Sequence, residues 1–488
     1  MPNYILAIDQ GTTSTRAIVF DSMGSPVGSA QVELSQHFPQ PGWVEHDPIE
    51  IAEAAVSVAK QAIGRAKLGP EDIAAIGIAN QRETTVVWER RTGRPVANAI
   101  VWQDRRTAEI CRDIAKTDHA RSIRQITGLV IDPYFSSTKL MWLLSTIPDG
   151  QARAQAGELC FGTVDSWLLW HLTDREVHAT DATNASRTML LNLHDLQWDP
   201  EMLELFDIPE VMLPQVKNTA DDFGVTSKKV FGAEIPITAM AGDQHAALYG
   251  QACFKNGQIK CTYGTGAFVL ANKGTTPPIP SFDGNDAGLV ATLGFRIGSK
   301  KTYVTEGSVF VTGATVQWLR DGLGEISNAP ETVDLATSAG SNEGVDFVPA
   351  FVGLGAPHWQ PDATGSITGL TRGSDRSHIV RAALESTAYQ VKDVVDVMET
   401  GRTRSKQPIR ADGGQSDNPF VMQFQADILD RPVEVANIAQ TTALGAAFLA
   451  GRGVGMWRSD SEIESLWKAS AIYEPSMSES ERNSLYSG

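Results

Sequence analysis

Apolar residues near the start of the chain fall into short runs separated by turn residues. The runs YILAID, RAIVFD and VGSAQVEL are interrupted by QGTTST and SMGSP, which is typical of strands joined by tight turns. Apolar residues then recur at helical spacing from Ile51 to Ala62. Asp47 is the expected N-cap of this helix and Pro48 its first residue, and Glu50 stands three positions after the cap. The pattern predicts a β-meander followed by an amphipathic helix.

The next run, IAAIGIAN at residues 73–80, is apolar at almost every position. Such a run is expected for a strand that is buried on both faces of a sheet. Three short strands, a helix and a buried strand predict an α/β domain whose sheet begins antiparallel and becomes parallel.

A similar order of elements returns after about residue 250. GQIKCTYGTGAFVLAN predicts two strands around a Thr/Gly turn, TYVTEGSV another strand, and SHIVRAALESTAYQVKDVVDVME a long amphipathic helix. IRADGG predicts a strand that ends in a glycine pair, and Asn418 with Pro419 marks the start of a further helix. We therefore expect an α/β protein of two related halves, residues 1–249 and 250–488, which meet near PITAMAGDQHAALYGQ.

Length, charge and cysteine usage limit the class of protein. A chain of 488 residues is too long for one ordinary core. Its 41 basic and 58 acidic residues give a net charge of −17, which disfavours nucleic acid and anionic membranes as partners. The start lacks a basic segment before its short apolar run, so no signal peptide is expected. Four scattered cysteines favour buried thiols in a reducing, cytoplasmic compartment, with neither a disulfide frame nor a zinc site.

The first predicted turn combines a carboxylate, small residues and a cation. Its residues are Asp9, Gly11, Thr12, Thr13, Ser14 and Arg16. Backbone N–H groups and hydroxyls of small residues suit phosphate oxygens, and Asp9 can hold Mg²⁺ directly or through water. The alternative is a plain hairpin turn. The P-loop pattern is absent from the chain, so a nucleotide would have to bind in another way.

Two further turns lie in the second half. YGTGAF supplies another tip that is rich in N–H groups, and Gly413 with Gly414 lets a flat ring approach the backbone. The alternative for the glycine pair is an ordinary loop before a helix.

Polar and aromatic side chains after the buried strand suggest recognition of a polyol. Arg82 donates hydrogen bonds and Glu83 accepts them, so the pair can bracket vicinal hydroxyls. Trp102 and Tyr134 offer apolar faces to the C–H groups of a polyol. A surface ion pair and core aromatics are the alternatives.

Asp243 follows the small-residue strand of MAGDQHAAL. It is either a helix cap or a catalytic base that accepts the proton of a hydroxyl during phosphoryl transfer. The neighbouring His245 is interpreted as structural.

Taken together, these segments resemble the FGGY family of carbohydrate kinases. The resemblance runs nearly end to end along the chain. It rests on the segments IDQGTTSTRAIVFD, PGWVEHDP, IGIANQRETTVVWE, NAIVWQDRRTAEIC, FGTVDSWLLW, TDATNASRTML, AGDQHAALYGQ, YGTGAF, VPAFVGLGAPHW, VMQFQADIL and GSITGLTRGSDRSHIVRAALE. The segment GLVIDPYFS belongs to the resemblance as well, and NQRETT with its IDPYF indicates the branch of the family that phosphorylates glycerol.

The resemblance implies two actin-like domains of the ribonuclease H-like, hexokinase/Hsp70 type with a cleft between them, and an ATP- and Mg²⁺-dependent phosphorylation of glycerol. It places Asp9 at the metal and the nucleotide at Thr12, Thr13, Ser14, Arg16, Thr265, Gly313, Gln317, Gly414 and Asn418. It places the glycerol pocket at Arg82, Glu83, Trp102, Tyr134, Asp243, Gln244 and Phe268, with Asp243 as the catalytic base.

Two rival functions stay open: a kinase of this family that acts on another polyol or a pentulose, and a non-catalytic actin-like ATP-binding protein. The resemblance also leaves a homodimer and a homotetramer open. Control by a sugar bisphosphate or by histidine phosphorylation is not expected in TSKKVFGAEIPI, residues 226–237, because the segment has neither a glycine-rich loop with Arg nor a histidine.

Overall fold

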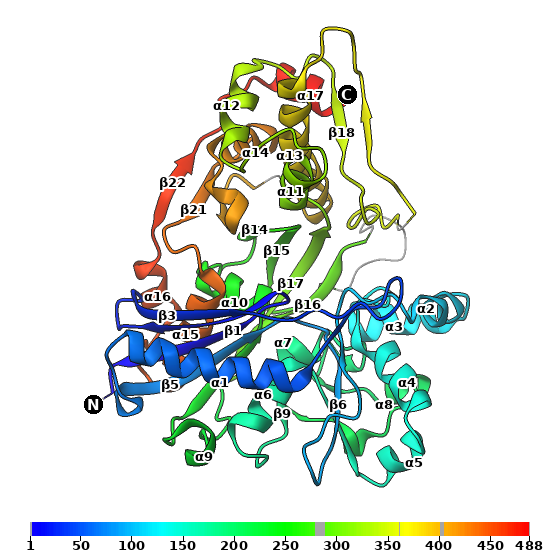
Figure 1. Ribbon diagram of the computed structural model, residues 1–488, viewed down its shortest axis with the longest axis vertical. Helices are drawn as coiled ribbons and strands as arrows, with labels where there is room; N and C mark the ends of the chain where they lie inside the picture. Colours follow the sequence, from blue (N-terminus) through cyan, green and yellow to red (C-terminus); the bar gives the residue numbers. More distant parts are fainter. Residues whose placement is uncertain (1, 279–287, 361, 401–404, 488) are drawn as a thin grey trace.

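The computed structural model describes residues 2–278, 288–360, 362–400 and 405–487, arranged as a lower and an upper part around two sheets (Figure 1). The first sheet has five strands in the order β13-β5-β1-β2-β3. Their bounds are β1 Tyr4–Gln10, β2 Ser14–Phe20, β3 Pro26–Glu33, β5 Ile73–Asn80 and β13 Ile237–Gly242. The β1–β2 and β2–β3 pairs are antiparallel and the β1–β5 and β5–β13 pairs are parallel, which confirms the predicted change of direction.

Helix α1, Pro48–Arg65, covers one face of this sheet. The carboxylate of Asp47 accepts a hydrogen bond from the N–H of Ile49, so Asp47 is the N-cap that the sequence predicts. Glu50 does not complete a capping box. Its carboxylate accepts hydrogen bonds from the backbone N–H and the hydroxyl of Ser35, at 3.0 and 2.9 Å, and so ties the helix to the loop after β3.

The second sheet has seven strands in the order β16-β17-β15-β14-β20-β21-β22. Their bounds are β14 Ile259–Tyr263, β15 Ala267–Gly274, β16 Val290–Ile297, β17 Lys300–Val309, β20 Ile409–Asp412, β21 Val433–Ala436 and β22 Ala469–Tyr473. The β14–β15 pair is the predicted hairpin around a Thr/Gly turn. Helices α13, Arg376–Met398, and α14, Pro419–Leu429, pack on this half, and Asn418 caps α14 as predicted.

The remaining elements of the described chain fill the loops between these strands. In the first half they are β4 Glu45–His46, a 3-10 turn Pro70–Asp72, β6 Val86–Glu89, β7 Ala99–Ile100, α2 Ala108–Ala115, α3 His119–Thr127, α4 Ser136–Thr146, α5 Gly150–Gln155, β8 Leu159–Gly162, α6 Val164–Leu172, β9 Ala179–Asp181, α7 Ala182–Ala185, β10 Leu191–Asn192, β11 Gln197–Trp198, α8 Pro200–Leu205, a 3-10 turn Glu210–Met212, β12 Gln215–Lys217 and α9 Lys228–Phe231. In the second half they are α11 Gly313–Asp321, α12 Glu331–Ser338, β18 Asp346–Val348, β19 Ser366–Thr368, a 3-10 turn Gly414–Asp417, α16 Asp460–Leu466 and α17 Glu479–Ser487.

Two helices connect the halves. Helix α10, Asp243–Gly250, and helix α15, Thr441–Gly453, pack against each other, and α15 lies on strands β1, β5 and β13 of the first sheet. One buried apolar cluster contains residues of both helices, of the first sheet and of strands β15 to β17. The two sheets therefore share a core, to which the second half contributes a helix that covers the first sheet.

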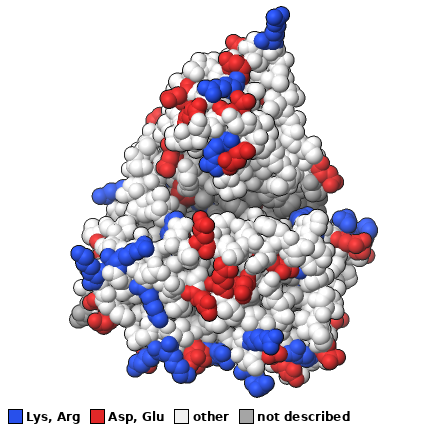
Figure 2. Space-filling model, viewed as in Figure 1, with Lys and Arg blue, Asp and Glu red and all other residues white. Residues whose placement is uncertain are grey.

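The structure shows the state of the cysteines, the distribution of surface charge and the apolar character of the helices. The cysteines Cys111, Cys160, Cys253 and Cys261 are buried and free, as predicted. On the face drawn in Figure 2, basic side chains are interspersed with acidic ones and form no continuous patch. Within the residues that the structure describes, no helix combines the length and apolar character needed to cross a membrane.

The contact between α10 and α15 generates a stability prediction. A Cβ atom added to Gly445 would lie 1.8 Å from the carbonyl oxygen of Ala246, whereas one added to Gly64, in α1, would meet no atom within 4 Å. We expect Gly445→Ala to lower the free energy of unfolding by about 1–3 kcal/mol, the usual cost of overpacking a core. The measurement is the urea midpoint of unfolding, which should fall.

Gly64→Ala is the matched control. It adds the same methyl group to an exposed helix and should raise stability by about 0.5–1 kcal/mol, because alanine loses less backbone freedom in a helix than glycine does. Equal urea midpoints for the two variants would contradict the close packing of α10 on α15.

Candidate functional site

Three parallel strands of the first sheet end at the same level. Gln10 of β1 pairs with Asn80 of β5, and Asn80 pairs with Gly242 of β13. The segments that follow these strands therefore emerge side by side. As a result, Arg82, after β5, lies with its Nε atom 3.1 Å from the Oδ1 atom of Asp243, after β13.

The turn after β1 is tight. The N–H of Gly11 donates to the carbonyl of Ser14 at 2.9 Å, and Arg16 stands opposite Asp9 in the β1–β2 register. The Arg16 guanidinium donates to the Oε1 atom of Gln31 at 2.9 and 2.6 Å, and the Gln31 amide donates to the Ser14 hydroxyl at 3.0 Å. Gln31, which sequence reasoning missed, thus binds both residues.

Asp9 lies at the end of β1 among other charges. Burial and the charge of Asp243 raise the pKa of Asp9 to about 7, against the opposing effect of Arg16. Two carboxylates that repel each other at one edge of the sheet fit a divalent cation, which neutralises both. In the described part of the chain, no cluster of three or more His, Cys, Asp and Glu side chains is arranged to hold a metal alone. This donor set is typical of Mg²⁺ that is bound by one or two carboxylates and by substrate phosphates.

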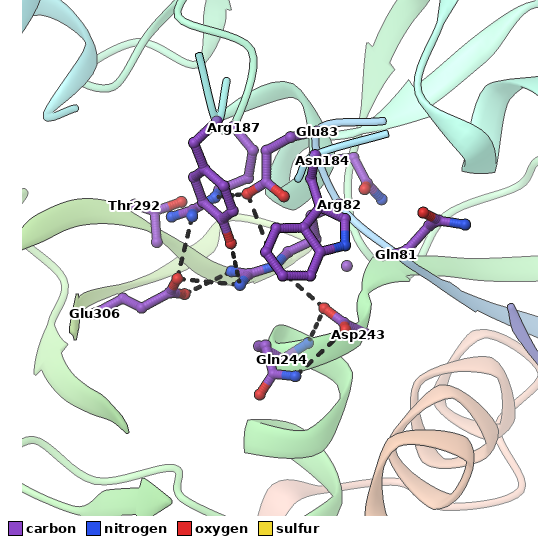
Figure 3. Close-up of polar contacts among 12 residues, drawn as sticks. Gln81, Arg82, Glu83, Asn184, Arg187, Asp243, Gln244, Thr292 and Glu306 are labelled. Atoms are coloured by element: carbon purple, nitrogen blue, oxygen red, sulfur yellow. Dashed lines mark hydrogen bonds and ion pairs between the residues drawn. The ribbon is translucent and has the colours of Figure 1, made fainter. Parts of the chain in front are cut away.

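Arg82 and Glu83 do not form an isolated surface ion pair. Both side chains are buried, and the distance from Arg82 Nε to Glu83 Oε1 is 3.9 Å. The Nη1 and Nη2 atoms of Arg82 donate to the two carboxylate oxygens of Glu306 at 2.5 and 3.0 Å, and Arg187 Nε donates to Glu83 Oε1 at 2.6 Å (Figure 3). The fork of the guanidinium, which we expected to face a polyol, is turned toward Glu306.

Glu306 and Arg187 are site residues that sequence reasoning missed. Glu306 lies inside the strand predicted from TYVTEGSV, and Arg187 lies in TDATNASRTML, a segment used only for the family resemblance. A charged residue in an otherwise strand-like run was the available signal for Glu306, since a buried charge needs a partner.

Aromatic side chains surround Arg82. The rings of Trp102 and Tyr134 meet edge to face with their centroids 5.5 Å apart, and the ring of Phe268 lies 5.9 Å from the guanidinium carbon of Arg82. The indole N–H of Trp102 donates to the Thr12 hydroxyl at 2.9 Å. The predicted polyol pocket and the predicted phosphate turn are therefore in direct contact.

Asp243 is the first residue of α10, and its side chain is 29% exposed, so that a substrate can reach it. Its Oδ1 atom accepts the backbone N–H of Gln244 at 2.7 Å. The buried Lys260 of β14, also missed, donates to the Gln244 amide oxygen at 2.5 Å and fixes that side chain from the second half. His245 is fully buried, and burial together with the charge of Arg82 lowers its pKa well below the usual range. It is therefore neutral.

The predicted nucleotide residues of the second half lie around one cavity of about 530 Å³. Its lining includes Thr265, Gly313, Gln317, Gly414 and Asn418. The neighbouring Gly413 has a φ of +90°, and a Cβ atom there would lie 2.5 Å from the carbonyl oxygen of Tyr263, so the strand β20 can turn here only with glycine.

Asn418 has two roles within the protein. Its side-chain oxygen accepts from the N–H groups of Phe420 and Val421, and its amide donates to the Thr332 hydroxyl at 3.1 Å. Asn418 therefore shapes the cavity through α14 and α12.

The family model for the N-terminal domain of the FGGY family of carbohydrate kinases matches residues 4–250, and the one for its C-terminal domain matches residues 259–454. The chain is 56% identical to "Glycerol kinase 2" of Thermotoga maritima, over 99% of this chain and 97% of that protein. It is 53% identical to the glycerol kinase of Caldanaerobacter subterraneus subsp. tengcongensis, over 100% and 97%.

Among solved structures, glycerol kinase of Plasmodium falciparum with ADP matches with a TM-score of 0.92 and 37% identity, covering 99% of this chain and 96% of that one. A gluconate kinase from Lactobacillus acidophilus matches with a TM-score of 0.87 and 24% identity, over 99% and 95%, a likeness of fold alone.

Proposed function

Since the chain belongs to the FGGY family of carbohydrate kinases, we propose that it transfers the γ-phosphoryl group of ATP to glycerol, giving sn-glycerol 3-phosphate and ADP. Relatives that are more than half identical over nearly the whole chain carry the name glycerol kinase. The observation that carries the proposal within the molecule is the meeting of Asp243 with Arg82, 3.1 Å apart, beside the turn at Thr12.

The pocket favours a short polyol. Of the five N–H groups of the Arg82 guanidinium, two bind Glu306 and one faces Asp243, so two remain as donors to a polyol. Glu83 supplies a carboxylate, and the Tyr134 hydroxyl lies 3.5 Å from the Arg82 Nη2 atom. Trp102 and Phe268 stand around this polar group as apolar walls. Hydroxyls of glycerol bind to the polar group, while its C–H groups contact the aromatic rings.

Catalysis depends mainly on the positions of the reacting groups. Asp243 accepts the proton of a terminal hydroxyl of glycerol while the hydroxyl oxygen bonds to the γ-phosphorus. The bond from that phosphorus to the β–γ bridging oxygen breaks, and ADP leaves. Gln244 fixes the direction of the Asp243 side chain in two ways: its backbone N–H donates to Oδ1, and its side-chain amide, which Lys260 holds, donates to Oδ2 at 3.3 Å. Alignment of the two reactants in a closed cleft supplies much of the acceleration.

The nucleotide binds across both halves in this proposal. The adenosine part takes the 530 Å³ cavity around Gly414 and Gln317, and the phosphates reach the turns at Thr12, Thr13 and Thr265. Ser14 and Arg16 adjoin the first turn through Gln31. The ADP bound by the Plasmodium falciparum relative supports the use of this nucleotide pair.

The halves act as two domains, residues 1–249 and 250–488, in a protein that we place in the cytoplasm. That the protein forms a homodimer or a homotetramer stays a prediction. So does the absence of bisphosphate or phosphohistidine control at residues 226–237, where Lys228 and Lys229 pair with Glu234 and Asp174.

Asp9 would hold a nucleotide-bound Mg²⁺, with Asp243 nearby. When bound, the ion supplies positive charge that offsets the charge of the phosphates. We expect removal of divalent cations with a chelator to stop ADP formation and added Mg²⁺ to restore it, as measured in a coupled assay. Undiminished turnover in the presence of chelator would exclude this role of Asp9.

A substrate panel tests the proposed reaction. Purified protein is assayed for ADP release with glycerol, erythritol, xylulose, gluconate and no acceptor. We expect kcat/KM to be highest for glycerol, because the pocket around Arg82 and Trp102 suits a short triol. A higher kcat/KM for xylulose or gluconate would favour another kinase of the family, and ADP release that no acceptor stimulates would favour the non-catalytic actin-like alternative.

Asp243→Asn separates chemistry from binding. The amide keeps the size of the side chain but cannot accept the proton, so kcat should fall by about 10²–10⁴-fold, the usual cost of losing a general base. The KM for ATP should stay near the wild-type value, since the phosphate turns lie on other segments. Steady-state kinetics at saturating glycerol and ATP give the result.

Asp113→Asn is the control, because Asp113 is exposed and pairs only with Lys116 at 2.9 Å in the described structure. It should leave both constants unchanged. Near wild-type turnover of Asp243→Asn would show that another group is the base.

A further inference from the structure

Two residues of the candidate polyol pocket, Arg82 and Glu83, form a set of four charged side chains with Arg187 and Glu306. Each side chain is at most 2% exposed. Arg187 bridges the two carboxylates, with Nε 2.6 Å from Glu83 Oε1 and Nη2 3.1 Å from Glu306 Oε1. Two cations and two anions alternate, so the set has no net charge. We call it the charge quartet (Figure 3).

Within the quartet, Glu306 binds Arg82 through both carboxylate oxygens. The distances are 2.5 Å from Nη1 to Oε2 and 3.0 Å from Nη2 to Oε1. Two parallel charge-assisted hydrogen bonds fix the plane of a guanidinium as well as its position. With its Nη atoms held in this way, Arg82 presents its Nε atom to Asp243 at 3.1 Å.

Glu306 comes from the other half of the molecule. It lies on β17, an interior strand of the second sheet, where it pairs with Leu270 on one side and Val290 on the other. Arg82 follows β5 of the first sheet. Arg82 is thus bound by a residue on an interior strand of the opposite half.

Glu306 remains charged in this place. Burial acts to raise its pKa, but the guanidiniums of Arg187 and Arg82 outweigh burial and hold the pKa well below the usual range. An ionised carboxylate keeps both of its hydrogen bonds to Arg82.

We propose that Glu306 and Arg187 are positioning residues: they hold the Arg82 guanidinium in the plane in which it recognises the polyol and faces Asp243. The inference rests on the proposed glycerol phosphorylation. It goes beyond that function, because it states that a strand of the second half sets the geometry of the recognition site in the first half.

The principal variant is Glu306→Gln, which keeps the shape of the side chain and removes its charge. We expect the KM for glycerol to rise about 10–100-fold, the equivalent of losing a hydrogen bond between charged groups. The KM for ATP should change by less than about twofold, because no hydrogen bond or ion pair of the described residues joins the quartet to the nucleotide turns. A purely structural role would reduce the amount of active enzyme, and so the apparent kcat, without moving the KM for glycerol.

Two further variants complete the test. Glu306→Asp keeps the charge and shortens the reach, so its KM for glycerol should lie between those of the wild type and Glu306→Gln. Glu399→Gln is the matched control: Glu399 pairs with the buried Arg431 at 2.9 Å, away from the quartet. It should lower the melting temperature and leave the KM for glycerol unchanged.

The outcomes separate this inference from the proposed function. If the wild-type protein releases ADP with another polyol rather than glycerol, the proposed function fails, and the same comparison is made with that polyol. Wild-type KM values in folded Glu306→Gln would overturn the positioning role. So would an equal change of KM in Glu399→Gln, or a Glu306→Asp protein that does not fold while Glu399→Gln does. A wild-type protein that phosphorylates no polyol would overturn both proposals.

Discussion

The parallel pairing of β1, β5 and β13 is the constraint on which the candidate site depends. Hydrogen bonds between these strands bring Gln10, Asn80 and Gly242 to one level. The carboxyl ends of parallel strands share one edge of a sheet, and the loops that leave this edge are where open α/β folds place their ligands. The second sheet repeats the arrangement with β14 and β20, whose parallel register places the turn at Gly264 beside Gly413. Side chains from the two halves meet at this point, as in the pairs Arg82–Glu306 and Lys260–Gln244.

Burying the charge quartet carries a cost in folding free energy. Removing four ionised groups from water is unfavourable unless every charge has a partner with good geometry. Glu83 carries a second cost, because its φ of 60° is a left-handed conformation that side chains with a Cβ atom rarely adopt. The carbonyl of Glu83 accepts hydrogen bonds from the hydroxyls of Thr85 and Ser136, at 3.1 and 2.9 Å, which help to hold that conformation. Unfavourable contributions to the folding free energy that are concentrated at one place are typical of a functional site.

Features that depend on neighbours in sequence were predictable. The strand at 73–80, the cap at Asp47 and the turn at Gly413 follow from local spacing and backbone preference, and the structure confirms them. The partner of Arg82 was not predictable, because Glu306 is 224 positions away and nothing in the spacing of TYVTEGSV shows which way its carboxylate points. For the same reason, the sequence did not reveal that Lys260 holds Gln244. The roles of the site residues remain predictions, while their proximity is a property of the fold.

The position of α15 has a consequence for the order in which the protein matures. During synthesis the strands of the first sheet leave the ribosome long before residues 441–453 do. Until that helix is made, the apolar face around Gly77, which later contacts Ala446, has no permanent cover. Domains of large proteins usually fold as units from the N-terminal end, but the complete core of this first half includes one of the last helices of the second. We therefore expect a nascent chain of this protein to leave part of a hydrophobic sheet face without its α15 cover for most of its synthesis.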